Sequence, residues 1–277
     1  MTNKRQAEII AVINQKGGVG KTTVTVNLAT ALGERGKRVL IVDLDSSTSS
    51  TSALGVPEIF EGTAEVLLGM VQLEEVILSD GDHDDVSLPK NVSIAIGRRN
   101  LEHLDSDLQT INKFADPGET LARQLARVSA GFDYILCDTS PTLSTPTRSA
   151  YQVARWAIIS SMPQQLSVEG IALAMDDVAA VREARNKQIE LLGVCMVNVD
   201  GRSTTAGSHQ IANVAEVLPT NAGLFTLINR STHVTESQQL GQSILTYQSD
   251  HKVSNQFRRL ADEVEQRVQA RREREHG

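Results

Sequence analysis

The sequence has few of the features that would place it in several large classes of protein. Aromatic residues make up only 3% of its 277 positions, which disfavours binding of single-stranded nucleic acid by base stacking. No apolar run reaches the roughly 20 residues that a transmembrane helix needs, so we expect none. Residues 1–8 are mostly polar and lack the apolar centre of a secretion signal. These absences favour a cytoplasmic protein.

The sequence also has few cysteines and no excess of positive charge. The two cysteines, Cys137 and Cys195, lie in apolar runs typical of strands and show no CxxC spacing, so we expect buried, reduced thiols and no zinc or redox site. The formal net charge is −7 and the sequence pI is about 5.4. An acidic chain is not a globally basic nucleic-acid binder, although a local basic patch remains possible.

Apolar, β-branched runs alternate with helical patterns from one end of the chain to the other. This alternation predicts an α/β fold, a single doubly wound and mostly parallel sheet with helices on both faces. Strands are expected at residues 9–14, 38–43, 92–96, 132–138, 156–161, 191–198 and 224–229. Helices are expected at residues 22–34, 62–70, 101–114, 119–128, 166–189, 207–217 and 253–272.

The organisation predicted from these elements is one domain over residues 1–277. Its ends are a polar tail at residues 1–7 and a C-terminal helix and charged tail at residues 253–277. We find no linker rich in Pro, Gly or Ser between two cores and no internal repeat, so one domain is the simpler interpretation.

The most informative stretch is residues 15–23, Q-K-G-G-V-G-K-T-T, between the first expected strand and the first expected helix. Strand, glycine loop and helix form the setting of a phosphate-binding loop, in which backbone N–H groups and the positive end of the helix dipole face a polyphosphate. Lys21 is then expected to reach the β- and γ-phosphates, and the Thr22 hydroxyl to bind Mg²⁺. The alternative is a glycine turn flanked by solvated lysines.

This loop differs from the usual G-x-x-x-x-G-K-[ST] pattern, because Gln15 stands at the first glycine and Lys16 precedes the glycine pair. It resembles the deviant Walker A motif, K-G-G-x-x-G-K-[ST], of the ParA/MinD family of ATPases. The resemblance implies that Lys16 crosses a dimer interface to the partner's nucleotide. It also implies ATP and Mg²⁺ as ligands of Lys16, Gly17, Gly18, Val19, Gly20, Lys21, Thr22 and Thr23.

Carboxylates at two strand ends complete the expected site. Asp138 ends an apolar strand as a Walker B residue does, so we expect it beside Mg²⁺; a turn-capping role is the alternative. The stretch Asp43-Leu44-Asp45 resembles the family's D-x-D-P-Q motif, which implies that Asp45 acts in hydrolysis and near the metal. Ser46 and Ser47 replace Pro-Gln, and residues 46–52, nearly all Ser and Thr, predict a mobile loop.

The resemblance continues along nearly the whole chain. Residues 167–170 resemble its A-L-E-G stretch, and residues 235–244 its S-E-A-P-S-x-G-K-P-I stretch with the prolines and the lysine replaced. It implies that Asn198 and Arg230 contact or flank adenine. No Thr/Asn-Lys-x-Asp guanine motif occurs, which favours ATP over GTP. With about seven residues before the first strand, the chain is similar to the short ParA type without an N-terminal helix-turn-helix.

The family also implies a mechanism and partners. ATP joins two subunits into a homodimer, the dimer binds double-stranded DNA without sequence preference, and a ParB-like or cargo-adaptor partner stimulates hydrolysis. The protein is then cytoplasmic and associated with the nucleoid. The residues expected to contact DNA are Arg202, His233, Lys252, Arg258 and Arg259. For the charged C-terminal helix, a solvated surface is the alternative.

Three other functions remain open on the sequence. A MinD-like membrane ATPase would use a C-terminal amphipathic helix, but the apolar stripe Phe257, Leu260, Val264 and Val268 is followed by charged residues, so we expect no membrane binding. An amide-forming ligase or an iron–sulfur scaffold of the same fold would need a substrate pocket or bridging cysteines that the sequence does not indicate. A nucleotide-switched binding module with little turnover is the third.

Overall fold

The fold is built on a sheet whose strands and helices alternate along the chain. The computed structural model describes residues 6–57, 61–111, 113–163, 167–200, 205–219 and 222–276. The strands are β1 (Glu8–Ile13), β2 (Val39–Leu44), β3 (Ile77–Ser79), β4 (Val92–Ala95), β5 (Tyr134–Thr139), β6 (Trp156–Ser161), β7 (Glu190–Met196) and β8 (Gly223–Leu224). Six of the seven predicted strands are present near their expected bounds, the seventh is reduced to the two-residue β8, and β3 is an additional one that sequence patterns did not reveal.

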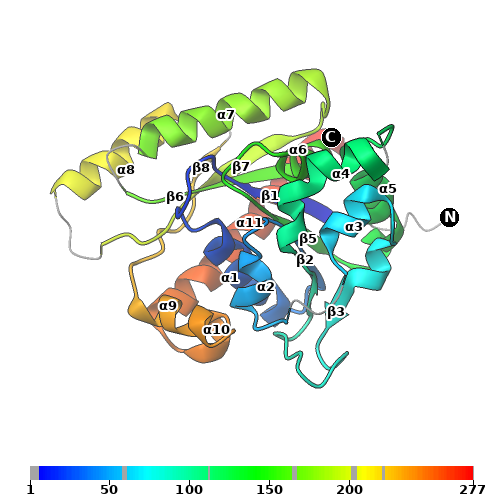
Figure 1. Ribbon diagram of the computed structural model, residues 1–277. Coiled ribbons are helices and arrows are strands. Elements are labelled where there is room, and N and C mark those ends of the chain that lie inside the picture. The colour runs from blue at the N-terminus through cyan, green and yellow to red at the C-terminus, as the bar shows by residue number, and fades with distance from the viewer. Residues whose placement is uncertain are drawn as a thin grey trace.

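The strands form one sheet in the order β3-β4-β2-β5-β1-β6-β7-β8. Figure 1 shows this sheet with helices around it. Every neighbouring pair is parallel except β3 with β4, so the predicted, mostly parallel sheet is confirmed. The carboxyl ends of parallel strands lie at one edge of a sheet, and ligands of open α/β folds bind there. In this chain the edge carries the segments that follow Ile13, Leu44, Thr139 and Met196.

Helices cover both faces of the sheet. One face carries α1 (Lys21–Glu34), α2 (Ser49–Ala53), α9 (Thr232–Gln239), α10 (Ile244–Tyr247) and α11 (Lys252–His276). The other carries α3 (Thr63–Leu68), α4 (Leu104–Ile111), α5 (Pro117–Val128), α6 (Thr145–Val153), α7 (Ser167–Ala184) and α8 (Thr205–Val217). Short 3-10 turns occur at Leu73–Val76, Arg99–His103 and Ser129–Gly131. No helix in the described residues has the length and apolar character needed to cross a membrane.

The strand pattern divides the core into two layers. In β1, Ile10 and Val12 face the layer under α1 and α11, whereas Ala11 and Ile13 face the layer under α3–α8. All residues of β2 are buried, as a strand covered on both faces requires. Burial on both faces explains why the runs are continuously apolar, and it fixes the register of the strand ends that carry the functional groups.

α6 was missed because the sequence at and before its start, with Pro141 and Pro146 among hydroxyl residues, resembles a loop. Pro146 lies in the first turn of the helix, where its missing N–H costs no hydrogen bond. The loop-like composition therefore coincides with a helix start, and α6 packs its buried side, including Tyr151, into the second layer.

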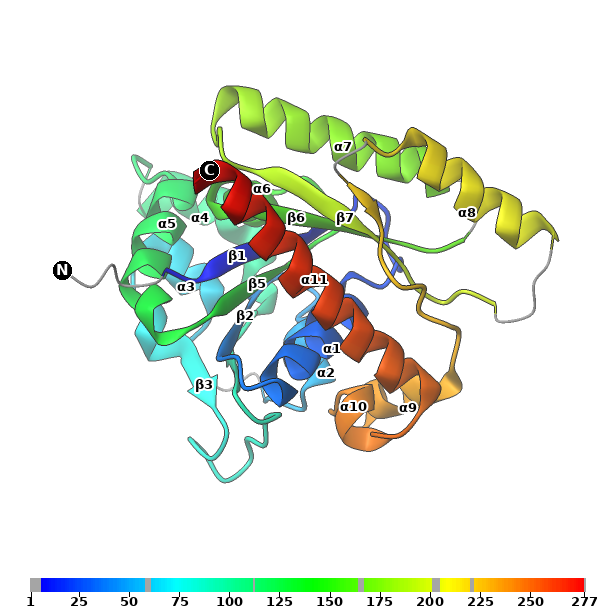
Figure 2. The ribbon, with the colours of Figure 1, turned by 180° about the vertical axis from the view of Figure 1, so that it is seen from behind.

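α11 lies diagonally across the first layer (Figure 2). The apolar stripe of α11 is buried, with Phe257, Leu260 and Val264 at 0% exposure, so the interpretation as a packing stripe is confirmed. Ion pairs join its polar sides to the end of α1, from Arg258 to Glu34 and from Glu265 to Arg35 and Lys37. α11 is thus held to α1 by both its apolar and its charged side chains.

β8 is shorter than predicted because side chains of α11 take the backbone groups that would continue it. Glu263 accepts from the Thr226 N–H at 2.8 Å, and Arg267 donates to the Gly223 and Leu224 carbonyls at 2.9 and 2.6 Å. The Arg267 guanidinium also stacks 3.9 Å from the centre of the Phe225 ring. The expected strand 224–229 is therefore a two-residue strand followed by an irregular segment alongside β7.

We predict that Gly33→Ala destabilises the protein although alanine is the better helix former. A Cβ at Gly33, in α1, would overlap the Lys90 carbonyl oxygen and lie 3.1 Å from Val92 Cγ2. Overpacking of this kind costs about 1–3 kcal/mol of stability, whereas the gain in helix propensity from Gly to Ala is at most about 1 kcal/mol. The net effect is therefore expected to be destabilising. Urea unfolding without nucleotide should show a lower midpoint for Gly33→Ala. Gly131→Ala is the matched control, because a Cβ there meets no atom within 4 Å.

Candidate functional site

A cavity of about 920 Å³ lies at the carboxyl edge of the sheet. It is lined by residues that follow β1, β2, β5, β6, β7 and β8, including Gly17–Thr23, Asp45, Ser140, Met162, Asn198 and Arg230. Most of the residues predicted from the sequence to bind nucleotide therefore come together at one place. This volume is within the range of pockets that hold small-molecule ligands, about 300–1,000 Å³.

The glycine loop has the backbone that a phosphate cradle requires. Gly18 and Gly20 have φ values of +70° and +87°, in the left-handed region that favours glycine. At Gly20 a Cβ would also lie 2.5 Å from Val197 Cγ2, whereas a Cβ at Gly17 would meet nothing within 4 Å. The base of the loop is fixed by a 2.8 Å hydrogen bond from Ser160 Oγ to the Val19 carbonyl. The loop is rigid at its base and open on its outer side.

Lys21 begins α1 and is only 7% exposed. Burial lowers the pKa of its ammonium group, and the carboxylates of Asp138 and Asp45 act in the opposite direction. Its Nζ lies 3.4 Å from the Lys16 carbonyl oxygen, a long contact for a buried cation. An anion in the cavity would supply the strong partners that Lys21 has only in part, which fits a polyphosphate.

Asp43 and Asp138 are register neighbours on β2 and β5, and both are fully buried. Burial raises the pKa of Asp43 to about 7, with a further contribution from the charge of Asp138. Burial likewise raises the pKa of Asp138 to about 6, against hydrogen bonds from Ser50 and Thr22. Two neighbouring carboxylates that are buried away from water repel each other, and this arrangement is electrostatically unfavourable unless a cation lies nearby.

The residues present fit Mg²⁺. Thr22 Oγ1 donates to Asp138 Oδ2 at 2.7 Å, which places one hydroxyl and one carboxylate beside the phosphate loop. No cluster of three or more His, Cys, Asp or Glu able to hold a metal occurs in the described part of the chain. Mg²⁺ does not require one, because it usually keeps several waters and takes one or two protein carboxylates together with substrate phosphates.

Asp45 is placed differently from Asp43. It is 8% exposed and lines the cavity, and its Oδ1 accepts from the Ser47 N–H at 2.9 Å. Asp43 does not line the cavity; it accepts from the Thr51 N–H and hydroxyl at 2.9 and 2.8 Å and from the Asp45 N–H at 3.2 Å. Of this pair, Asp45 is the carboxylate that can reach a ligand, and Asp43 organises the segment behind it.

The segment 46–52, predicted as a mobile loop, is partly helical, and that prediction is wrong. α2 begins at Ser49, and its buried hydroxyls serve the carboxylates: Ser50 Oγ donates to Asp138 Oδ2 at 2.7 Å, and Thr51 binds Asp43. Ser and Thr have low helix propensity, but buried carboxylates need donors, and this need decides the conformation. Ser50 and Thr51 are therefore site residues that sequence reasoning missed.

The end of the cavity beyond the phosphate loop is more apolar, with Met162, Ile228 and Val234 in its lining. Asn198 lines the same end, with φ +57° and its amide 3.8 Å from Met162 Sδ. Arg230 also lines the cavity and is exposed. This end suits a planar base, and the placement of both predicted adenine residues supports the assignment, which remains a prediction.

Lys16 lies beside the cavity and is not among the residues that line it. Its backbone N–H donates to Asn14 Oδ1 at 2.9 Å, and its side chain is half-buried. The two lysines of the loop therefore differ: Lys21 belongs to the cavity of its own subunit, and Lys16 stands next to the exposed glycines Gly17 and Gly18.

The predicted DNA contacts are only partly described. Arg202 lies outside the described residues. Lys252 and Arg259 are exposed, whereas Arg258 pairs with Glu34 at 2.7 Å and His233 Nδ1 lies 2.9 Å from Glu236 Oε2.

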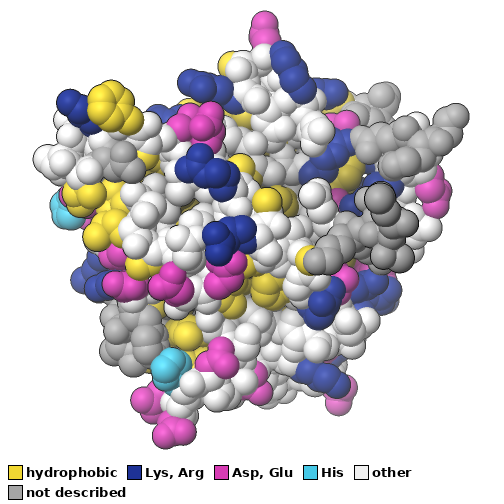
Figure 3. Space-filling view, turned by 90° about the vertical axis from the view of Figure 1, so that its right-hand side faces the viewer, with side chains coloured by type: hydrophobic (Ala, Val, Ile, Leu, Met, Phe, Trp, Pro, Cys, Tyr) yellow, Lys and Arg dark blue, Asp and Glu magenta, His cyan; other side chains and the backbone are white. Residues whose placement is uncertain are grey.

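On the side of the molecule formed by α3–α5, acidic and basic side chains are interspersed without a large basic area among the described residues (Figure 3). The DNA assignment thus remains a prediction.

Comparison with known proteins gives consistent relatives. The AAA domain family model matches residues 7–191. The chromosome-partitioning ATPase Soj of Thermus thermophilus is 32% identical over 260 residues, covering 94% of this chain and 96% of Soj.

Solved structures agree in fold. The septum site-determining protein MinD of Pyrococcus horikoshii, complexed with Mg-ADP, has a TM-score of 0.72 and 27% identity, covering 93% of this chain and 96% of MinD. A cobyrinic acid a,c-diamide synthase of Mycobacterium smegmatis with bound ADP and magnesium has a TM-score of 0.75 and 26% identity, covering 92% of this chain and 93% of the synthase.

We predict that Lys21→Ala and Asp45→Ala separate binding from turnover. Lys21→Ala should weaken ATP binding by at least about a hundredfold, because charge-assisted bonds to two phosphates, about 1.5–3 kcal/mol each, are lost. Asp45→Ala should retain binding but lose most of kcat, because Asp45 would orient the attacking water. Binding is measured with a fluorescent ATP analogue and turnover by phosphate release.

Lys90→Ala is the matched control for charge removal, since Lys90 is exposed and is not among the residues that line the cavity. Unchanged ATP affinity in Lys21→Ala, or unchanged kcat in Asp45→Ala, would show that the roles are wrongly assigned.

Proposed function

This chain belongs to the AAA domain family and is a P-loop ATPase of the ParA/MinD type, and on that premise we propose that it positions cargo through a DNA-bound, ATP-dependent dimer. Hydrolysis, stimulated by a ParB-like or adaptor partner, releases the subunits. The observation that carries the proposal is the pair of lysines in one loop: Lys21 is buried in its own cavity, while Lys16 stands beside the exposed glycines outside it.

The residues of the cavity support hydrolysis of ATP with Mg²⁺. Mg²⁺, when bound, would supply positive charge that neutralises the charge developing on the phosphates during transfer. The protein contributes Lys21 at the phosphates, Thr22 and Asp138 toward the metal, and Asp45 as the carboxylate that orients water. Ser50 and Thr51 keep Asp138 and Asp43 in place by donating to them at 2.7 and 2.8 Å. The buried carboxyl groups of Asp43 and Asp138 hold the surrounding hydroxyl groups and the loop backbone in place.

The open side of the glycine loop supports the dimer. A Cβ built at Gly17 or Gly18 meets no atom within 4 Å, so the outer side of the loop is free for a second subunit to approach. Facing copies would bring each Lys16 to the partner's phosphates, and the γ-phosphate would then supply charge-assisted bonds across the interface. Loss of that phosphate weakens the interface, which is how hydrolysis would release the subunits.

We propose DNA binding from the family resemblance, and the residues that it implies are cations on and near α11 and after β7. The exposed cations Lys252 and Arg259 begin α11, and Arg202 follows β7 in sequence. Arg258 pairs with Glu34, so its contribution to a DNA face would compete with that ion pair. With a net charge of −7, binding to DNA is expected to be weak, strongly dependent on salt, and to appear only in the ATP dimer.

The proposed location is the cytoplasm, in association with the nucleoid. Both cysteines are unpaired and buried, and burial raises the pKa of Cys137 to about 12, as expected for inert thiols. Membrane binding by the α11 stripe, the MinD-like alternative, is disfavoured because the stripe is part of the core. Buried cysteines on two separate strands likewise do not favour an iron–sulfur scaffold.

We predict that Lys16→Ala binds ATP as a monomer. Sedimentation velocity with Mg-ATP, in an Asp45→Ala background to suppress hydrolysis, should show a dimer that the added Lys16→Ala change abolishes. ATP affinity of the monomer should change little, because Lys16 does not line the cavity of its own subunit. Lys90→Ala in the same background should still dimerise; an unaltered dimer in the Lys16 variant would refute the interface.

We predict that Arg202→Glu weakens binding of duplex DNA in Mg-ATP by about tenfold or more at low salt, since it replaces a phosphate-binding cation with an anion. Fluorescence anisotropy of a labelled, arbitrary-sequence duplex measures the effect. Arg182→Glu, an exposed change of equal charge on α7, is the control. If both variants bind DNA like the unmodified protein, the DNA-binding face lies elsewhere. If only the net charge matters, the affinity for DNA will fall equally in the two variants.

A further inference from the structure

α9 forms one wall of the cavity through Val234, Thr235, Gln238 and Gln239. Of these, Gln238 reaches the phosphate loop: its Nε2 donates to Thr23 Oγ1 at 3.0 Å. Thr23 lies in the first turn of α1, two residues after Lys21, and also lines the cavity. One side chain thus joins two walls that are 215 residues apart in sequence.

Gln238 lies on the cavity wall between the apolar end and the phosphate loop. Val234 precedes it by one helical turn, so both side chains lie on the same face of α9. Val234 belongs to the apolar end of the cavity, and Thr23 to the phosphate end. Gln238 is therefore placed between the two, beside the sugar and first phosphate that a nucleotide would have there if its base occupied the apolar end and its other phosphates lay at Lys21.

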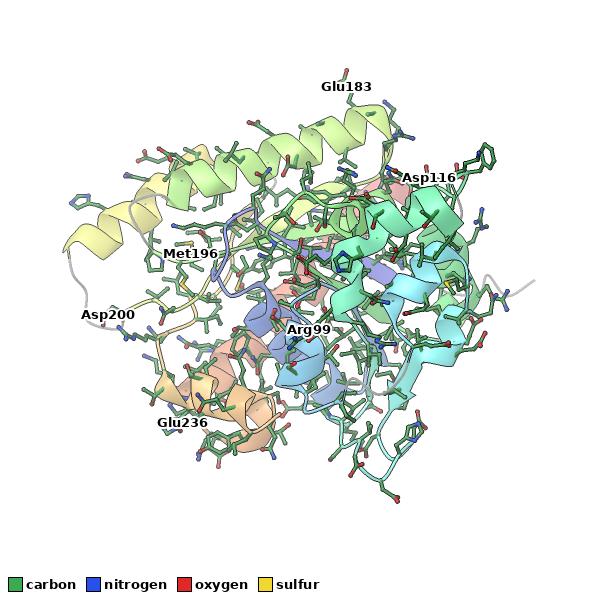
Figure 4. All side chains as sticks on the ribbon, viewed as in Figure 1. Arg99, Asp116, Glu183, Met196, Asp200 and Glu236 are labelled. Carbon is green, nitrogen blue, oxygen red and sulfur yellow. The ribbon has the colours of Figure 1, made fainter. Side chains whose placement is uncertain are left out.

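The helix that carries Gln238 is firmly held. Ser237 is fully buried, and its hydroxyl donates to the Val234 carbonyl at 3.0 Å. Just beyond the helix, the backbone of Gly241 packs against that of Gly55, so closely that a Cβ on Gly241 would lie 2.6 Å from Gly55 Cα. Glu236 lies on the outward side of α9 (Figure 4) and is 44% exposed. Gln238 is consequently an inward-facing group on a fixed support.

We propose that Gln238 is a positioning residue for nucleotide binding, which holds the Thr23 hydroxyl and the α9 wall at the α-phosphate and ribose end of the ligand. The proposal depends on the function above only in requiring that nucleotide enters this cavity. Because the α-phosphate and ribose are common to ATP and ADP, Gln238 contributes equally to both. Equal binding of ground and transition states changes KM and leaves kcat unaltered.

The test compares Gln238→Ala, Gln238→Glu and the control Gln242→Ala, whose side chain is exposed and outside the cavity lining. For Gln238→Ala we expect ATP and ADP affinities to fall by the same factor, about three- to tenfold, with kcat retained. Gln238→Glu removes the N–H that donates to Thr23 Oγ1 and places an anion near phosphates, so its loss of affinity should be larger and should diminish with salt. Calorimetry gives the affinities and phosphate release gives kcat.

A double-mutant cycle with Thr23→Val separates positioning from simple loss of stability. If Gln238 acts through Thr23, the two changes are not additive in nucleotide affinity. The nucleotide-free melting temperature should stay the same, while the increase in melting temperature caused by ADP becomes smaller. A lower kcat at unchanged KM, a loss confined to ATP, or additive effects would overturn the proposal. If the unmodified protein itself binds no ATP, the proposed function fails instead.

Discussion

The placement of Asp43, Asp45 and Asp138 around Lys21 at one buried edge of the sheet is the constraint on which the rest of the structure depends. Parallel strands end together, so residues far apart in sequence become neighbours without any long-range recognition of their own. Burial makes this cluster electrostatically unfavourable, and the surrounding hydroxyls of Thr22, Ser50 and Thr51 reduce the cost. The fold thus forms a site suited to a cation and a polyphosphate, and the surrounding hydrogen bonds keep the side chains of that site in position.

The core follows from the same requirement. A strand that carries a buried carboxylate at its end must itself be fixed in register, because a slip of one residue would turn the carboxylate to the other face. β2 and β5 achieve this by being buried on both faces, and β1 lies between β5 and β6. α1 then starts directly from the loop after β1, so the same helix supports the phosphate loop and packs against α11.

Sequence patterns were sufficient for the fold and for the groups that carry charge. The alternation of apolar strands and helices predicted the parallel sheet, and the spacing of Lys16, Lys21 and Thr22 after a strand predicted the phosphate loop. These features are local, and each is decided by residues close together in the chain. Asp138 was predicted because it ends an apolar strand, and Asp45 because Asp43-Leu44-Asp45 resembles the family's D-x-D-P-Q motif.

What the sequence could not provide depends on contacts between distant segments. α2 was mistaken for a mobile loop because the helix depends on hydrogen bonds from Thr51 to Asp43 and from Ser50 to Asp138, 88 residues away. The strand expected at residues 224–229 ended early because Glu263 and Arg267 of α11 bind its backbone. Gln238 gave no local signal of its own, since a glutamine in a helix is ordinary until its partner Thr23 is known.

The short β8 and the arginine that closes over it have a consequence for the behaviour of the protein at high concentration. An open sheet edge exposes unpaired N–H and C=O groups that can recruit a strand from another molecule. Here the edge is two residues long, and Arg267 covers its carbonyls while stacking on Phe225. The C-terminal helix therefore also protects this sheet edge from pairing with a strand of another molecule, and so from aggregation.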